Sequence, residues 1–94
     1  MMYLDAKGAH IPAIGLGTWE LRGRDCARIV EQAVRLGYRH FDTAQMYGNE
    51  REVGEGIRAS GIKRDEVFVT TKVSPDNLAP MLLARSVKES VGAL

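Results

Sequence analysis

β-Branched and aromatic residues dominate one short stretch of the chain, which reads Val67-Phe68-Val69-Thr70-Thr71-Lys72. Residues of these types favour extended structure. A nearly continuous run of them, without polar residues in alternation, is typical of a parallel strand whose two faces are covered by helices. We therefore predict that this stretch is a strand buried on both faces of a parallel sheet.

Two further strands are expected upstream, over residues 13–17 and 38–42, and a helical pattern follows each of the three. The predicted strands end near Gly17, Asp42 and Lys72, so the βα unit recurs every ~25 to 30 residues, the spacing of right-handed βαβ crossovers. Such crossovers join parallel strands. The sequence therefore predicts an α/β fold built on a parallel sheet.

The first helix is expected over residues 25–36. Apolar residues recur here at the helical spacing i, i+3, i+4 and i+7, which predicts one buried face. Its members are Cys26, Ile29, Val30 and Ala33. Cys26 is the only cysteine, so it has no partner for an internal disulfide, and we expect it to be a small apolar core residue. Gly37 is expected to end the helix in the left-handed conformation.

The second helix is expected to begin at Asn49, because Glu52 follows three residues later and completes a capping box. It is expected to end near Gly61. Gly54 and Gly56 lie inside it, and each glycine costs about 1 kcal/mol relative to alanine in a helix. Close packing against a neighbouring element is therefore expected at these two glycines.

The third helix is expected to follow Asn77, its predicted N-cap, with Pro80 in the first turn, where the missing N–H costs nothing. An apolar stripe is expected along this helix. It comprises Leu83, Val87, Val91 and Leu94. Ahead of all these units, residues 3–5 and 10–12 with a turn at Lys7-Gly8 predict a short β-hairpin, placed as a lid or plug.

The composition limits the chain to one small domain or part of a larger one. It has 94 residues, 45% hydrophobic and 27% charged, which is typical of soluble globular proteins. We interpret residues 1–94 as a single partial domain, because three parallel strands leave open sheet edges. A net charge of +1 and the lack of a long apolar run argue against nucleic acid and membrane partners. We expect a cytoplasmic protein, since no leader pattern is present.

Charged residues end two of the predicted strands, at the sheet edge where parallel α/β proteins gather their functional groups. Lys72 closes an apolar strand, where an ammonium needs a counter-charge. Asp42 ends the neighbouring strand, about 4.8 Å away. We expect an ion pair between them, and the pattern alone leaves open whether it is structural or catalytic.

Tyr47 favours the catalytic interpretation, because the loop after Asp42 can fold its phenol over the same strand ends. The Lys72 ammonium would stabilise the tyrosinate and make the phenol a better proton donor. Asp42 would orient Lys72 and keep it charged. Such a group suits protonation of a carbonyl oxygen while hydride arrives at the carbon, and it requires no metal ion.

The glycines near the first strand do not predict a Rossmann fold. Gly15 and Gly17 begin the G-x-G-x-x-G pattern, but Glu20 stands where the third glycine belongs. Trp19 follows this strand and is interpreted equally well as a core aromatic residue or as the wall of a ligand pocket.

The two histidines have no spacing typical of metal ligands. His40 lies on the same predicted strand as Asp42, and we expect a hydrogen-bonded interior side chain there. His10 lies in the predicted hairpin and is expected to be exposed.

A longer pattern resembles the first sequence signature of the aldo-keto reductases. It reads Gly37-Tyr38-Arg39-His40-Phe41-Asp42-Thr43-Ala44, then five residues, then Glu50-Arg51-Glu52-Val53-Gly54. Two flanking segments resemble the ends of the first and third strands of that family. They are Gly15-Leu16-Gly17-Thr18-Trp19 and Thr70-Thr71-Lys72. The resemblance extends from Tyr3 to about Ser90 and is greatest to compact microbial members such as the diketogluconate reductases.

The resemblance implies a fold and a reaction. The fold is the N-terminal portion of a (β/α)8 TIM barrel, here about three βα units preceded by a short hairpin. The reaction is the NADPH-dependent reduction of small aldehydes and ketones to alcohols. The family's catalytic residues fall on Asp42, Tyr47 and Lys72. Its cofactor-binding positions fall on Gly17, Thr18, Trp19 and Asp42, and its substrate pocket includes Trp19 and Tyr47.

One departure from the family pattern limits this interpretation. The family's fourth catalytic residue, a histidine after the fourth strand, has no counterpart in residues 1–94, and a whole barrel needs roughly 250 residues. We therefore expect a monomeric parent enzyme, but an isolated chain that is inactive and self-associates through open sheet edges. The alternatives are a non-catalytic barrel segment and a binding or regulatory relative, either of which would pair with another chain.

Overall fold

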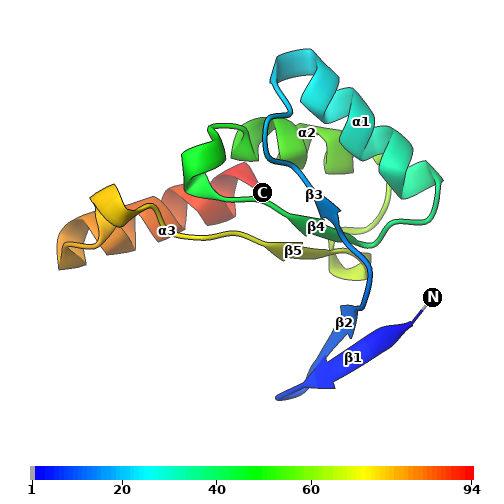
Figure 1. Cartoon of the computed structure of the whole chain (residues 1–94), viewed down its shortest axis with the longest axis horizontal. Coiled ribbons are helices and arrows are strands. Elements are labelled where there is room, and N and C mark those ends of the chain that lie inside the picture. The colour runs from blue at the N-terminus through cyan, green and yellow to red at the C-terminus, as the bar shows by residue number, and fades with distance from the viewer. Residues whose placement is uncertain (1) are drawn as a thin grey trace.

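The computed structural model describes residues 2–94, which form a β-hairpin followed by three βα units (Figure 1). The hairpin pairs β1 (Tyr3–Ala6) with β2 (Ala9–Pro12) and projects away from the rest of the chain. Its turn residues Lys7 and Gly8 have φ values of 48° and 84°. Positive φ at both central residues is what a type I′ hairpin turn requires. The predicted hairpin is confirmed.

The three remaining strands form one parallel sheet. They are β3 (Leu16–Gly17), β4 (His40–Asp42) and β5 (Phe68–Thr70), in the spatial order β3-β4-β5. The register aligns the last residues of all three strands. The predicted α/β fold with a parallel sheet is therefore confirmed, and its strand ends meet at one edge.

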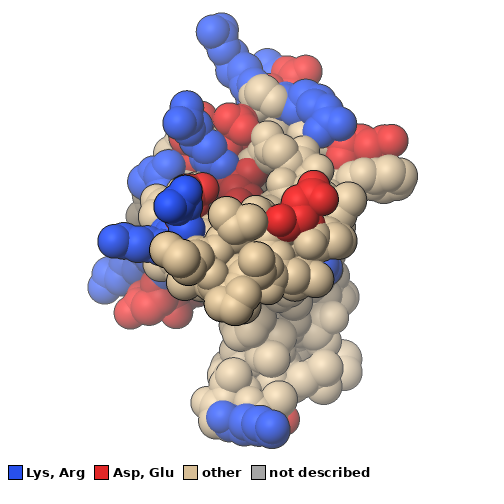
Figure 2. Space-filling view, turned by 90° about the vertical axis from the view of Figure 1, so that its left-hand side faces the viewer, with Lys and Arg blue, Asp and Glu red and all other residues tan. Residues whose placement is uncertain are grey.

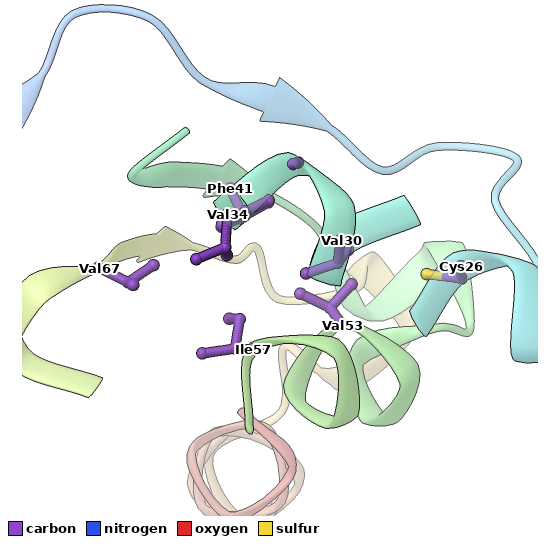
Figure 3. Close-up of a cluster of buried hydrophobic side chains, with 8 residues drawn as sticks. Cys26, Val30, Val34, Phe41, Val53, Ile57 and Val67 are labelled. Atoms are coloured by element: carbon purple, nitrogen blue, oxygen red, sulfur yellow. The ribbon is translucent and has the colours of Figure 1, made fainter. Parts of the chain in front are cut away.

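Two helices cover one face of this sheet, α1 (Gly23–Arg35) and α2 (Glu50–Ser60), while α3 (Pro80–Ala93) lies beside α2 (Figure 1). The apolar core fills the space between the sheet and the first two helices (Figure 3). Its buried members are Cys26, Val30, Ala33, Val34, Phe41, Val53, Ile57 and Val67. Cys26 is fully buried, as a core residue. Within residues 2–94, no helix combines the length and hydrophobicity needed to cross a membrane.

The two glycines inside α2 mark its closest contacts, as predicted. A Cβ atom at Gly54 would collide with the carbonyl oxygen of Ala93 in α3. A Cβ atom at Gly56 would lie 2.7 Å from Cβ of Val30, and it would also collide with the carbonyl oxygen of Ala27 in α1. The two neighbouring helices therefore approach α2 to distances that only glycine allows.

The first strand is shorter and more exposed than predicted. Only Leu16 and Gly17 of the expected residues 13–17 are in β3, and the three residues before them are exposed. The physical reason is that β3 has β4 on one side, and among the described residues no strand pairs with its other side.

The prediction that residues 67–72 are buried on both faces is wrong. Val67 is buried, but every residue of β5 is only half-buried. The helices α1 and α2 cover one face of the sheet, and within residues 2–94 no strand pairs with the outer edge of β5.

The apolar stripe predicted for α3 is present but largely exposed. Leu83, Val87 and Val91 are 37%, 43% and 73% exposed, whereas Ser86 and Ser90 are buried. Ser90 faces inward and bonds to Gln45 and Glu50, whereas the Ser86 hydroxyl donates to the Leu83 carbonyl oxygen of the same helix. The N-cap of α3 is Ala79 rather than the predicted Asn77, which lies in the short 3₁₀ helix η3 (Pro75–Asn77).

The buried face of α1 also differs in one position from the prediction. Ile29 is 37% exposed, and Val34 is buried in its place. The helix turns the row Cys26, Val30, Ala33 and Val34 toward the core, so Ile29 lies at the rim. Gly37, with φ 108°, follows the helix in a positive-φ conformation as expected.

Candidate active site

The carboxyl edge of the sheet holds the predicted site residues together. The backbone ladder continues beyond the strands, because Thr18 N–H donates to the Asp42 carbonyl at 3.0 Å and Gln45 N–H donates to the Lys72 carbonyl at 3.0 Å. The loop after β4 is thus tied to the segments after β3 and β5. This backbone frame determines which side chains can meet above the sheet.

Asp42 and Lys72 form an ion pair at this edge, as the spacing of parallel strands predicts. The Lys72 ammonium donates to the Asp42 carboxylate and also to the Thr43 carbonyl oxygen, at 3.1 Å. The two charged side chains are 48% and 51% exposed, so the pair is open to solvent. The hydrogen bond that Lys72 donates to Asp42 raises the pKa of Lys72. Desolvation opposes this rise, while the neighbouring Asp42 carboxylate and Tyr47 side chain add to it. Lys72 is therefore a cation at neutral pH.

Tyr47 lies next to this pair. It ends the short 3₁₀ helix η1 (Gln45–Tyr47), and the Lys72 ammonium lies 5.3 Å from the centre of its ring. Arg22 donates a hydrogen bond of 2.9 Å to the Tyr47 carbonyl oxygen and so ties η1 to the start of α1. The structure thus brings all three predicted catalytic side chains together. Arg22 carries no signal in the sequence that would have indicated this contact.

The segment after β3 combines exposed and buried residues. Trp19 is 67% exposed, which excludes the interpretation as a core residue. Thr18 is fully buried, and its hydroxyl donates to the Asp42 carbonyl oxygen at 3.2 Å. Gly17 is exposed, and a Cβ atom there would meet nothing within 4 Å. Backbone and an indole ring, rather than the threonine side chain, therefore face the open side of the sheet edge.

Both histidines make contacts that link parts of the fold. His40 Nδ1 lies 3.1 Å from the Pro12 carbonyl oxygen and its Nε2 lies 3.0 Å from Oγ1 of Thr70. His40 thereby joins the hairpin to the sheet, as the interpretation of a hydrogen-bonded interior residue predicts. His10 is exposed and pairs with Asp5 at 2.7 Å.

A polar network behind the site was not predicted from the sequence. Gln45 donates to Ser90 at 3.1 Å, and Ser90 donates to Glu50 at 3.0 Å. Thr71 donates to the other carboxylate oxygen of Glu50 at 2.6 Å. Ser86 and Ser90 lie four residues apart and so on one face of the helix, which is the one signal that could have indicated this polar face. The network fixes α3 against the loops that carry Tyr47 and Lys72.

Asn49 begins α2 as predicted, but its side chain does not cap the helix. The capping-box prediction is wrong in this respect. Its Nδ2 group instead contacts the loop after β3, 28 to 31 residues away in the sequence. Its Oδ1 atom contacts Thr43, which directly follows β4 and lies 6 residues away. Such partners cannot be inferred from a local pattern.

The model of the Aldo/keto reductase family matches residues 13–94. This chain belongs to that family. Solved aldo-keto reductase structures cover the whole chain or nearly all of it, so the three βα units are part of a TIM barrel. The fold implied by the sequence resemblance is thus confirmed.

Relatives of this aldo/keto reductase chain include a methylglyoxal reductase DkgB of Yersinia pestis, 49% identical over 84 residues, which are 89% of this chain and 32% of the relative. A crystal structure provisionally named 2,5-diketo-D-gluconic acid reductase B is 52% identical, with a TM-score of 0.92 over 100% of this chain and 34% of that chain. An aldo-keto reductase of Bombyx mori in complex with NADP is 36% identical, with a TM-score of 0.87 over 99% of this chain and 34% of that chain. The chain spans about a third of the length of these proteins.

Proposed function

We propose that this chain supplies the proton-donating part of the active site of an NADPH-dependent reductase that converts aldehydes and ketones to alcohols. The observation that carries the proposal is the position of the Lys72 ammonium, which contacts Asp42 and lies over the ring of Tyr47. The similarity to reductases with about half of the residues identical supports the same conclusion.

Tyr47 is the general acid in this proposal. A free tyrosine is a poor proton donor at neutral pH, because its pKa is ~10. The neighbouring Lys72 cation stabilises the phenolate that remains after proton transfer, so the transfer to a carbonyl oxygen costs less. Asp42 and the Thr43 carbonyl hold the ammonium in place.

The strand-end surface fits a nicotinamide ring. Gly17 has open space where a side chain would stand, and the indole of Trp19 and the carboxylate of Asp42 lie exposed or half-exposed beside it. Gly17, Thr18, Trp19 and Asp42 are the residues proposed to hold the cofactor, with Thr18 contributing backbone only because its side chain is buried. The bound cofactor supplies the hydride.

The substrate is proposed to be a small carbonyl compound held between Trp19 and Tyr47. A flat, exposed indole offers apolar contact area, while the phenol supplies a hydrogen bond to the carbonyl oxygen. The charge of Lys72 lies beside Tyr47 and stabilises the phenolate that remains when the phenol gives up its proton.

The test of this proposal is Tyr47→Phe in a complete barrel that carries this chain. Removal of the phenolic proton is expected to lower kcat for small aldehydes by about 10²- to 10⁴-fold, the usual contribution of a positioned acid. Tyr38→Phe makes the same chemical change at a residue packed against the core and is expected to keep kcat. If Tyr47→Phe turned over substrate as fast as the wild type, Tyr47 would not be the acid.

A further inference from the structure

Asn49 is a buried polar side chain whose carboxamide bonds to two loops of the site through both Nδ2 and Oδ1. It is 1% exposed. Its Nδ2 group donates to the carbonyl oxygens of Thr18, at 2.8 Å, and Leu21, at 2.9 Å. Its Oδ1 atom accepts from the Thr43 hydroxyl at 3.1 Å. A buried carboxamide bonded to three backbone or side-chain partners is costly to replace, because each partner left unpaired loses its hydration without compensation.

The two carbonyls that Asn49 holds bracket a strained turn. Leu21 N–H donates to the Thr18 carbonyl at 3.2 Å, so Trp19 and Glu20 are the central residues of a four-residue turn. Glu20 has φ 68°, a conformation that glycine or asparagine adopts more readily at the second central position. Such strain persists only where the surroundings hold it in place. Asn49 provides that support at both ends of the turn.

The third bond connects the same carboxamide to the catalytic group. Thr43 directly follows Asp42, and its carbonyl oxygen is one of the two acceptors of the Lys72 ammonium. Asn49 itself is two residues beyond Tyr47 in the chain. One side chain therefore connects the turn that carries Trp19 with the segments that carry Asp42 and Tyr47.

We propose that Asn49 is a positioning residue that sets the distance between Trp19 and the acid Tyr47, and thereby the width of the carbonyl-binding space between them. The proposal rests on the proposed function, since it assigns these two residues to the substrate. Asparagine suits the position because it offers two donors and one acceptor in a plane. Aspartate has the same shape but no donor, so it would face two carbonyl oxygens without a proton to share.

The first experiment uses the 94-residue chain, in which Trp19 is the only tryptophan. Time-resolved fluorescence anisotropy measures the local motion of its indole. Asn49→Ala is expected to increase the amplitude of nanosecond motion about twofold, because the turn loses both hydrogen bonds from the Asn49 carboxamide. Val30→Ala, a core truncation that removes no hydrogen bond of Asn49, is the matched control and is expected to leave the amplitude unchanged.

A milder variant covers the case in which Asn49→Ala does not fold. Thr43→Val removes the donor to Oδ1 and keeps the carboxamide, so the amplitude is expected to rise in the same direction by a smaller amount. An unchanged Trp19 amplitude in every folded variant of Asn49 and Thr43 would overturn the proposal.

The second experiment measures kinetics in a complete barrel that carries this chain. Asn49→Ala is expected to lower kcat by about 10- to 100-fold, a cost comparable to that of a misplacement of about 1 Å, and to raise KM for the carbonyl substrate as well. A purely structural defect would reduce the folded fraction and leave KM unchanged, as Val30→Ala is expected to do.

The two proposals fail in different ways. If Tyr47→Phe abolished activity while Asn49→Ala kept the wild-type kcat and KM, the positioning role would be wrong and the proposed function would stand. If Tyr47→Phe were fully active but Asn49→Ala still freed Trp19 in the anisotropy measurement, the acid assignment would be wrong and the mechanical link between Asn49 and the turn would stand.

Discussion

Cys26 shows how a single buried residue makes stability depend on pH. The side chain is completely buried where α1 meets the rest of the core. Burial raises the pKa of the thiol from 9.0 to about 11, and the nearby charge of Glu52 adds to this rise. The thiol is therefore neutral in the folded chain at a pH where it is already ionised in the unfolded chain.

The first prediction concerns alkaline conditions. Because the pKa of Cys26 is higher in the folded state, the contribution of its neutral thiol to the free energy of unfolding is fully present below pH 9. This contribution is lost as the pH rises through about 11. The free energy of unfolding of the wild type is therefore expected to fall relative to that of Cys26→Ala between these values. Urea titrations at a series of pH values measure the difference, in which the other titrating groups cancel.

Alkylation provides an independent check of the same prediction. Iodoacetamide reacts with thiolates, so Cys26 is expected to react at pH 9 at least ~10-fold more slowly in the native chain than in urea. Equal rates in the two states would show that the thiol is neither buried nor suppressed.

At the scale of elements, α2 is the centre of the packing. Its two interior glycines allow α1 on one side and α3 on the other to approach the backbone closely. The sequence predicted this contact from the cost of two glycines in one helix. The sequence did not indicate which partner each glycine meets, because the partners lie on segments distant in the sequence.

The second prediction separates packing from helix propensity. Gly54→Ala and Gly56→Ala are each expected to lower the free energy of unfolding by about 1 to 3 kcal/mol, because the added methyl group collides with a backbone carbonyl. Gly92→Ala is the matched control in α3. A Cβ atom there meets nothing within 4 Å, so this substitution is expected to raise stability by up to about 1 kcal/mol. Thermal unfolding followed by circular dichroism distinguishes the three variants, and equal shifts would contradict the packing described for α2.

The helix α3 shows where an amphipathic pattern misleads. Its apolar residues repeat at helical spacing, yet the buried side chains of the helix are Ser86 and Ser90. Ser90 is buried because it bonds to Gln45 and Glu50, which lie 45 and 40 residues away. Hydrophobic periodicity identified a helix correctly but could not show which of its faces would find a partner.

At the scale of the whole molecule, large apolar areas remain at the surface. Met81 and Val91 on α3 are 80% and 73% exposed, and Leu78 just before the helix is 63% exposed. Figure 2 shows an uncharged area in the middle of the face in view, with charged side chains above it and to its sides. The outer edges of β3 and β5 have no strand beside them within residues 2–94. Both features favour association with other protein surface.

The third prediction follows from these surfaces. Light scattering on the 94-residue chain is expected to give a mass above the 10.4 kDa of one copy. The double variant Met81→Lys with Val91→Lys is expected to reduce this mass. Leu36→Lys, at an equally exposed apolar residue remote from α3 in the sequence, is the control and is expected to have little effect. A wild-type chain that stayed monomeric at high concentration would contradict the prediction.

Periodicity, turn residues and strand spacing were sufficient to predict the order of strands and helices, the parallel sheet and the meeting of Asp42 with Lys72. These features depend on local conformational preferences and on the regular geometry of neighbouring strands. Short stretches of sequence are enough to predict both. The burial of Ser90 in α3 and the three bonds of Asn49 depended on the packed chain. Each of them results from contacts between segments that are far apart in the sequence, and the burial of a polar group is favourable only where such a distant partner is present.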